Sequence, residues 1–327
     1  MLLRLSLPCW VVWALAVPAS AAPPRIAYLD KGDVWIVTPG LPRVERETRT
    51  GKVEDFRFSA DGQYLAYANR LRPGDGRPIC AIVITRVSTG SVIKELRPDE
   101  GWIDIDKWLG STLLYHASSG LEVSGFFEFD AARGAGRALD PGDAHILDTA
   151  LSRNGSLRAY VDDIGLGPTF QERLHLVNTV TGTDSVAVSK RSVMAPAFSW
   201  QNDAVAIIEV AGDGKLARDH LWIYRTSDRS LTLLSDEAVV AKSSGDGPAW
   251  SPDGTCVSVN FGSKLTVHAV AGNTPPKLLR GASACWSSAT SMVMLDANGI
   301  QQVDMVTGSQ HVLVSSGTRP QCLTVSD

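Results

Sequence analysis

The stretch "PAWSPDGTCVSVN", residues 248–260, recurs in altered form along the chain, and this repeat constrains the fold more than any other feature. It aligns with "PAFSWQNDAVAII", which begins at residue 196, without a gap. The same frame fits four further segments, one of them after a one-residue gap. The anchor residues of the six units are Phe58, Trp108, Leu151, Phe198, Trp250 and Trp286. Their mean spacing of about 46 residues lies in the range of repeat architectures.

Each unit has the same internal pattern. A polar turn follows the anchor, and in three units it contains Asp61-Gly62, Asn154-Gly155 or Asp253-Gly254. These dipeptides supply the positive-φ positions of a tight hairpin. Runs rich in β-branched and aromatic residues come next, such as "CAIVITRVSTG" and "LTVHAVAGN", followed by a fourth run such as "SVIKELR". The repeat predicts an all-β protein, a β-propeller of four-stranded antiparallel blades. A β-sandwich is the rival, but it does not explain the period.

The ends of the chain predict how the ring closes. The segments "RIAYLD", "DVWIVT" and "VERET" resemble strands two, three and four of a blade that lacks its first strand. The segment "QCLTV", residues 321–325, follows the blade of Trp286 and can supply that strand. We therefore expect seven blades, closed by pairing of the N- and C-terminal strands, with six blades as the alternative. Such pairing removes an exposed sheet edge.

The phrase "WSPDG", preceded by Pro-Ala and followed by an alternating strand, resembles the TolB-type (PD40, WD40-like) propeller repeat of exported bacterial proteins. The resemblance covers the mature chain at low detail, and only the blade around Trp250 carries the motif intact. Strand-like sequence begins at Arg25, where TolB has a separate N-terminal domain. The resemblance implies a propeller fold and a bacterial source.

The N-terminus resembles an export signal. Arg4 precedes an apolar stretch from Leu5 to Val17, and Ala19-Ser20-Ala21 forms the small-x-small pattern of a cleavage site. The stretch is shorter than the roughly 20 residues that cross a bilayer as a helix. We therefore expect a signal peptide at 1–21, a single propeller domain at 22–327 without a transmembrane segment, and a periplasmic or secreted protein.

Charge and cysteine content narrow the partners and the chemistry. The chain has 31 basic and 35 acidic residues without a basic run, which argues against a nucleic-acid partner. The four cysteines beyond the signal allow three pairings, which their spacing does not resolve. We expect small buried side chains and no more than one disulfide among Cys80, Cys256, Cys285 and Cys322.

Acidic residues lie just ahead of several anchors, where the chain enters each innermost strand. If the repeat alignment holds, they surround one mouth of the central channel. Their oxygens suit Ca²⁺ or a cationic ligand, whereas the structural alternative is that they bond nearby backbone amides. These candidate binding residues are Glu54, Asp55, Asp104, Asp148 and Asp246.

The second candidate surface consists of the connections between strands two and three. Three are long, at 70–79, 162–173 and 209–220, and all should lie on one face of the ring. The candidate binding residues in them are Arg72, Asp75, Arg77, Asp162, Asp163, Arg218, Asp219 and His220.

Catalytic motifs are missing from the sequence. It contains no G-x-S-x-G, no H-E-x-x-H, no P-loop and no dinucleotide fingerprint. We therefore expect a non-enzymatic module that binds a protein or a cell-envelope component. The alternatives are a propeller enzyme that acts on a carbohydrate or a lactone with the acids at the channel mouth, a cation-binding propeller, and an inert structural module.

Overall fold

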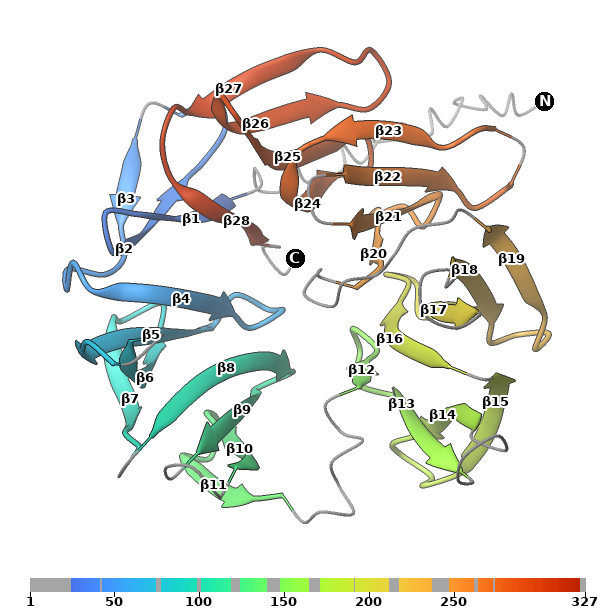
Figure 1. The fold of residues 1–327 in the computed structure, drawn as a ribbon, viewed down its shortest axis with the longest axis horizontal. Coiled ribbons are helices and arrows are strands. Elements are labelled where there is room, and N and C mark those ends of the chain that lie inside the picture. Colours follow the sequence, from blue (N-terminus) through green and yellow to red (C-terminus); the bar gives the residue numbers. More distant parts are fainter. Residues whose placement is uncertain are drawn as a thin grey trace, which may run out of the picture.

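The computed structural model describes residues 25–41, 43–74, 78–98, 101–118, 124–139, 148–164, 171–190, 192–211, 218–236, 247–261, 264–272 and 274–323. Over these ranges the chain forms seven four-stranded antiparallel sheets arranged in a ring (Figure 1). The predicted fold class and the count of seven blades are confirmed.

The blades are named A to G in chain order, and their strands run from the ring axis outward. Blade A contains β28 (Thr318–Leu323), β1 (Arg25–Asp30), β2 (Asp33–Val37) and β3 (Val44–Arg46). Blades B and C contain β4 (Val53–Phe58), β5 (Tyr64–Arg72), β6 (Ile79–Arg86), β7 (Ser91–Leu96), β8 (Trp102–Leu109), β9 (Thr112–Ser118), β10 (Ser124–Asp130) and β11 (Ala135–Ala138). Blades D and E contain β12 (Thr149–Leu151), β13 (Leu157–Ile164), β14 (Gln171–Asn178), β15 (Asp184–Lys190), β16 (Val193–Phe198), β17 (Ala204–Ala211), β18 (Arg218–Arg225) and β19 (Leu231–Ser235). Blades F and G contain β20 (Ala249–Trp250), β21 (Cys256–Phe261), β22 (Lys264–Ala269), β23 (Lys277–Arg280), β24 (Ala282–Ser288), β25 (Ser291–Asp296), β26 (Gly299–Asp304) and β27 (Gln310–Val314).

The two ends of the described chain close the ring. The C-terminal strand β28 pairs antiparallel with β1, with Leu323 opposite Arg25 and Cys322 opposite Ile26. It is the innermost strand of blade A, so the predicted closure is confirmed. The register also aligns Cys322 with the anchors of the other blades. Across blade A, Cys322 pairs with Ile26, Ile26 with Val37, and Val37 with Val44. Across blade B, the anchor Phe58 pairs in the same way with Leu65, and this row continues to Thr85 and Val92. Cys322 therefore occupies the anchor position of blade A.

A buried serine organises the turn that follows four of the anchors. In blade F the Oγ of Ser251 donates to Asp253 Oδ1 at 2.6 Å and accepts from the backbone N of Cys256 at 2.9 Å. Ser59, Ser152 and Ser199 make the equivalent pair of bonds in blades B, D and E. The turn spans 251–255, longer than the expected tight hairpin, and of the Asp253-Gly254 pair only the glycine has positive φ, at 73°. The serine hydroxyl takes the place of the missing ladder bonds.

Indole side chains connect the innermost strands of neighbouring blades. Trp250 Nε1 donates to the carbonyl O of Ala197 at 2.9 Å, and this residue directly precedes the anchor of the preceding blade. Trp108 makes the same contact with Arg57 O at 3.0 Å, and Trp286 with Ala249 O at 3.1 Å. Each of these three tryptophan anchors therefore holds its blade to the inner strand of the preceding blade.

Apolar clusters fill the junctions between blades, with one exception. Clusters of buried residues span the A–B, B–C, D–E, E–F, F–G and G–A junctions. The cluster nearest the C–D junction contains Leu114 and Leu139 with Leu109 and Phe126 around them, all from blade C. A polar contact, from Lys107 Nζ to Thr149 O at 3.3 Å, crosses this junction instead. Within the described ranges, C–D is the junction without a shared apolar cluster.

One disulfide joins Cys285 of β24 to Cys322 of β28, with a Cα–Cα distance of 5.7 Å. Cys80 is a buried free cysteine and Cys256 is a partly exposed one. Of the three pairings left open, the structure therefore selects a single bridge, at the seam where the ring closes. It cross-links the first and last inner strands of the circle.

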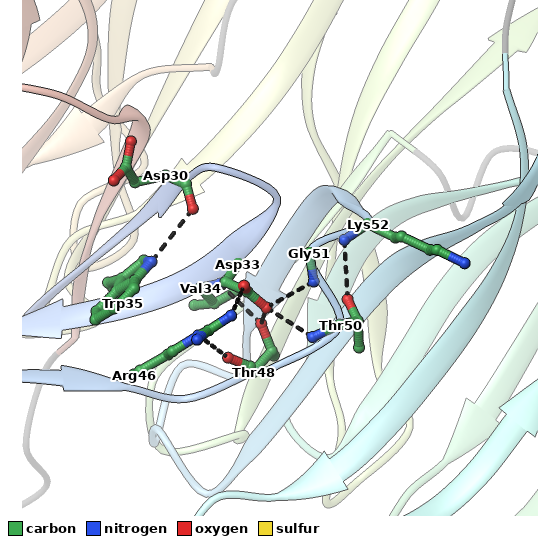
Figure 2. A network of polar contacts seen from close by, with 9 residues as sticks. All are labelled: Asp30, Asp33, Val34, Trp35, Arg46, Thr48, Thr50, Gly51 and Lys52. Atoms are coloured by element: carbon green, nitrogen blue, oxygen red, sulfur yellow. Dashed lines mark hydrogen bonds and ion pairs between the residues drawn. The ribbon is translucent and has the colours of Figure 1, made fainter.

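A buried carboxylate secures the junction of blades A and B (Figure 2). Asp33, whose side chain is 2% exposed, forms an ion pair with Arg46 and accepts bonds from Thr48 Oγ1 at 3.0 Å, Thr50 N at 2.8 Å and Gly51 N at 3.2 Å. Burial alone would raise the pKa of Asp33, but these bonds hold that pKa below its usual value. The network ties the β1–β2 turn to the segment that enters β4.

Among the described residues, no helix is long and apolar enough to cross a membrane. The predicted signal peptide at 1–21 lies outside the described residues and stays a prediction.

Replacing Trp250 with Phe should destabilise the ring, because the Ala197 carbonyl loses its donor and the smaller ring leaves space in a site that is 5% exposed. We expect a loss of about 1–3 kcal/mol in the free energy of unfolding, measured by urea denaturation. Val306→Ala is the control, because this side chain is 73% exposed. Its effect should stay within about 0.5 kcal/mol. Equal stabilities of the two variants would disprove the role of the indole contact.

Candidate functional site

A pocket of about 530 Å³ opens where blades G, A and B meet at their inner strands. We call it the seam pocket, because it adjoins the disulfide that closes the ring. Three consecutive residues from each of β4, β24 and β28 line it, namely Asp55, Phe56, Arg57, Ser283, Ala284, Cys285, Arg319, Pro320 and Gln321. In each blade these are the three residues ahead of the anchor position.

Two guanidinium groups converge on one carboxylate in the seam pocket. Asp55 Oδ1 lies 3.0 Å from Arg57 Nη1 and 2.5 Å from Arg319 Nη1, and it also accepts from the backbone N of Phe56. The side chains of Arg57 and Arg319 are 35% and 49% exposed, so N–H donors remain open to solvent. With both arginines charged and one carboxylate, the group has a net charge of +1. Gln321 also lines the pocket beside Arg319, and its Oε1 accepts a hydrogen bond from Phe58 N at 3.1 Å.

The backbone explains why these side chains gather. The innermost strands of blades A, E and G carry a bulge, and the residue three before the anchor position has left-handed φ: 53° at Arg319, 51° at Ala195 and 49° at Ser283. Because a bulge redirects a side chain away from the ladder, this position is available for function. The fold repeats the bulge, and the residue placed on it changes from blade to blade.

Charged residues continue along the inner strands of blades C and D. Asp106 is the extra residue of a bulge in β8, and its Oδ2 is buried without a hydrogen-bond partner. Burial raises the pKa of Asp106, although Lys107, Arg57 and His116 partly oppose the shift. Burial likewise raises the pKa of Asp148, while the backbone N of Ala195, which donates to it at 2.8 Å, and Lys107 oppose that shift. Positive and negative groups therefore alternate from Arg319 to Asp148.

Four of the five predicted acidic residues lie in the described part of the chain, and their surroundings differ. Asp55 lies in the seam pocket, whereas Glu54 forms an ion pair with Arg70 at 3.3 Å. Asp104 is exposed on β8 opposite His116, and Asp148 caps blade E through Ala195. Asp246 lies outside the described residues. The structure thus brings Asp55 to a pocket and places Asp148 beside an acid that the sequence did not suggest, Asp106.

The connections between strands two and three are shorter than expected, because the strands continue into them. The strands β5, β13 and β17 extend to Arg72, Ile164 and Ala211, and the next strands β6, β14 and β18 begin at Ile79, Gln171 and Arg218. The predicted residues that lie in strands rather than loops are Arg72, Asp162, Asp163, Arg218, Asp219 and His220. Asp75 and Arg77 lie outside the described residues. The six residues in strands are polar, and a run of polar residues in sequence is typical of a loop as well as of an exposed strand end.

Two of these strand residues already have partners within their own blade. Arg173 forms a two-bond ion pair with Asp162, and His220 Nδ1 lies 3.5 Å from Glu209. In blade D, His175 Nδ1 lies 2.9 Å from Asp184 Oδ1, and Tyr160 donates to the other oxygen of Asp184 at 2.7 Å. Burial and the Asp184 bond raise the pKa of Tyr160 to about 12. These contacts cross-link strands of one sheet.

No group of three His, Cys, Asp or Glu side chains within the described ranges is arranged to hold a metal ion. Calcium at the predicted acids, of which Asp246 lies outside those ranges, stays a prediction.

Sequence reasoning missed Arg57, Arg319, Asp106 and Lys107. Arg57 and Lys107 directly precede the anchors Phe58 and Trp108. The repeat alignment therefore places both residues on innermost strands, and they could have been found from it. Arg319 was missed because the closing strand was identified only from 321 onward, and β28 begins at Thr318.

Neither a protein-family model nor a curated protein sequence matches the chain. TolB from Acinetobacter baumannii is 13% identical, with 91% of this chain and 66% of that chain covered and a TM-score of 0.46. The uncharacterised protein lmo1340 from Listeria monocytogenes EGD-e is 10% identical over 87% of this chain and 89% of that one, with a TM-score of 0.54. An oligogalacturonate lyase in complex with manganese is 15% identical over 89% and 84%, with a TM-score of 0.52.

This chain therefore spans just under two thirds of the TolB chain. At such identities the likeness concerns the fold alone. The chain is a seven-bladed β-propeller, and the solved structures that it resembles in fold with a TM-score above 0.5 include lmo1340 and the oligogalacturonate lyase.

The opposite pKa shifts of Asp106 and Asp33 predict opposite effects of pH. Asp106 has a raised pKa, so its contribution to stability is present at low pH and is lost as the pH rises through that pKa. Asp106→Asn should therefore be more stable than the wild type at pH 7, and the difference should vanish as the pH falls below the usual pKa of an aspartate.

Asp33→Asn is the control of opposite sign. The lowered pKa of Asp33 stabilises the fold above about pH 4, so this variant should be less stable at pH 7 and approach the wild type as the pH falls. Urea denaturation across this pH range measures both effects. If the unfolding free energies of the two variants change with pH in the same way, the opposite pKa shifts of Asp106 and Asp33 are wrong.

Proposed function

We propose that this chain is an exported, non-enzymatic propeller that binds an acidic polypeptide segment of a partner protein in the seam pocket. The observation that supports the proposal is the pair of guanidinium groups, Arg57 and Arg319, preorganised by Asp55 in a pocket of about 530 Å³. This volume lies within the range of protein ligand sites.

The charge of the pocket favours a carboxylate as the ligand group. Each guanidinium offers five N–H donors in a planar fork, and carboxylates accept two of them side by side. Asp55 uses one donor from each arginine through Oδ1. It holds the guanidinium groups in place, and a ligand carboxylate can bind the remaining donors without a large loss of side-chain freedom.

The small residues of the pocket favour an extended peptide. Ser283, Ala284 and Pro320 line the pocket with short side chains. A peptide with an acidic side chain can place its backbone against these residues and its carboxylate on the arginines. The disulfide supports the export part of the proposal, because such bonds persist in oxidising compartments.

The proposal predicts that an acetylated tetraglutamate peptide binds the purified chain and that tetralysine does not. Arg319→Ala and Arg57→Ala should each weaken binding by about tenfold or more, because each removes a charge-assisted bond. Calorimetric titration measures the affinity, which should fall as salt is raised.

Arg97→Ala is the matched control, because Arg97 is exposed and pairs with Glu95 on the outer strand of blade B. It should bind as the wild type does. If Arg97→Ala weakens binding as much as Arg319→Ala, or if tetraglutamate does not bind at all, the seam pocket is not the site.

A second candidate function is acid–base catalysis by Asp106 and Asp148. Their raised pKa values and the intervening Lys107 are the observation that favours it, since active sites shift pKa values in this way. The oligogalacturonate lyase among the propeller neighbours suggests the first substrate to test, with manganese added. If this candidate is correct, the chain forms product from oligogalacturonate, and both Asp106→Asn and Asp148→Asn abolish that activity. Turnover that survives both substitutions would eliminate it.

A further inference from the structure

The seam disulfide occupies a position that has a different contact at three other junctions. There, an anchor tryptophan donates to the residue before the preceding anchor, as Trp286 does to Ala249. At the closing junction the anchor position holds Cys322, and the residue before the preceding anchor is Cys285. A covalent bond that can be reduced therefore stands where the ring otherwise uses an indole hydrogen bond.

The same disulfide borders the proposed binding site. Cys285 lines the seam pocket, and both of its cysteines are only partly buried. Cys322 lies on β28, directly after the pocket residues Arg319, Pro320 and Gln321. One wall of the pocket is thus a chain-terminal strand whose attachment to blade G includes this bond.

Without the disulfide, fewer contacts hold this wall. As an innermost strand, β28 has a ladder partner on one side only, β1, and that ladder is interrupted by a bulge. Among the described residues, its other polar side-chain contacts are Arg319 with Asp55 and Gln321 with Phe58, both made to blade B, and Leu323 packs in the apolar cluster of the A–B junction. The first of these is the contact that positions Arg319 for a ligand, so movement of β28 removes half of the cationic pair.

We propose that the Cys285–Cys322 disulfide is a redox control of the seam pocket: the oxidised chain binds its ligand, and reduction releases β28 and lowers the affinity. The inference rests on the proposed function, because it concerns the same site. It also gives β28 a role beyond closing the ring.

The chemistry requires an external dithiol. One of its thiolates attacks Cys285 Sγ, the sulfur next to the pocket, and the S–S bond breaks so that Cys322 leaves as a thiolate and takes up a proton. The second thiol of the reagent attacks the mixed disulfide, releases Cys285 as a thiol and forms the reagent's own disulfide. Two electrons and two protons pass from the dithiol to the protein.

The test compares the full chain in its oxidised form, after reduction with dithiothreitol, and after reoxidation. Two readouts are needed: the affinity for acetylated tetraglutamate, and hydrogen exchange of the amides of β28 relative to those of β17. We expect reduction to weaken binding by about tenfold or more, because the competent position of β28 becomes a minor state, and reoxidation to restore it. Exchange should accelerate in β28 while β17 stays protected.

Variants separate this effect from general damage by the reductant. Cys285→Ser/Cys322→Ser should bind as the reduced chain does and should no longer respond to dithiothreitol. Cys256→Ser, at a free cysteine of blade F, should behave like the wild type in both redox states. Equal affinity and equal β28 exchange in the oxidised and reduced chains would overturn the proposal, and so would reduction that exposes β17 as much as β28.

The two readouts also separate the failure of this proposal from that of the proposed function. If the oxidised chain does not bind tetraglutamate, the proposed function is wrong, and selective exchange of β28 on reduction still supports release of this wall. If the oxidised chain binds and reduction changes neither readout, the redox control is wrong and the binding function stands.

Discussion

The contact between the innermost strands of neighbouring blades is the constraint on which the rest of the structure depends. A four-stranded sheet has two faces to cover, and in a ring each face must be covered by the next sheet. The tryptophan anchors solve this with an indole that packs between sheets and donates to the backbone ahead of the preceding anchor, as Trp250 does with Ala197. At the B–C, E–F and F–G junctions, the indole thereby positions one blade on the preceding one. At the closing junction, where the last strand must find the first sheet, Cys322 and Cys285 make the corresponding contact covalent.

Functional side chains can occupy those inner-strand positions that do not take part in the packing between blades. The residue three before the anchor position lies on a bulge in several blades, and its side chain is not needed to join the sheets. In blade E it is Ala195, whereas in blade A it is Arg319, which meets Asp55 from the equivalent position of blade B. The site therefore arises from substitutions on a repeated backbone and does not require an added loop or domain.

The sequence predicted the features that depend on periodicity. The repeat specified the fold class, the seven blades and the closing strand, because strand alternation and turns leave their pattern in every unit. It did not predict which acids converge, since a bulge shifts the register by one residue and reverses the direction of a side chain, as at Asp106. It also misplaced Asp162, because the ion pair with Arg173 lets polar residues extend a strand that looks like a loop. Cross-blade pairs such as Arg319 with Asp55, more than 260 residues apart, carry no local signal.

The C–D junction has a consequence for the architecture as a whole. It is the described junction without a shared apolar cluster, and it divides the ring into blades A to C and blades D to G. These halves are not independent, because β28 belongs to the second half in sequence but completes a sheet of the first. A chain severed between blades C and D would thus give two fragments that recognise each other by donation of a strand. The propeller is in this sense an intramolecular complex of two unequal partners, which meet at the C–D junction and, through the Cys285–Cys322 cross-link, where β24 meets β28 (Figure 1).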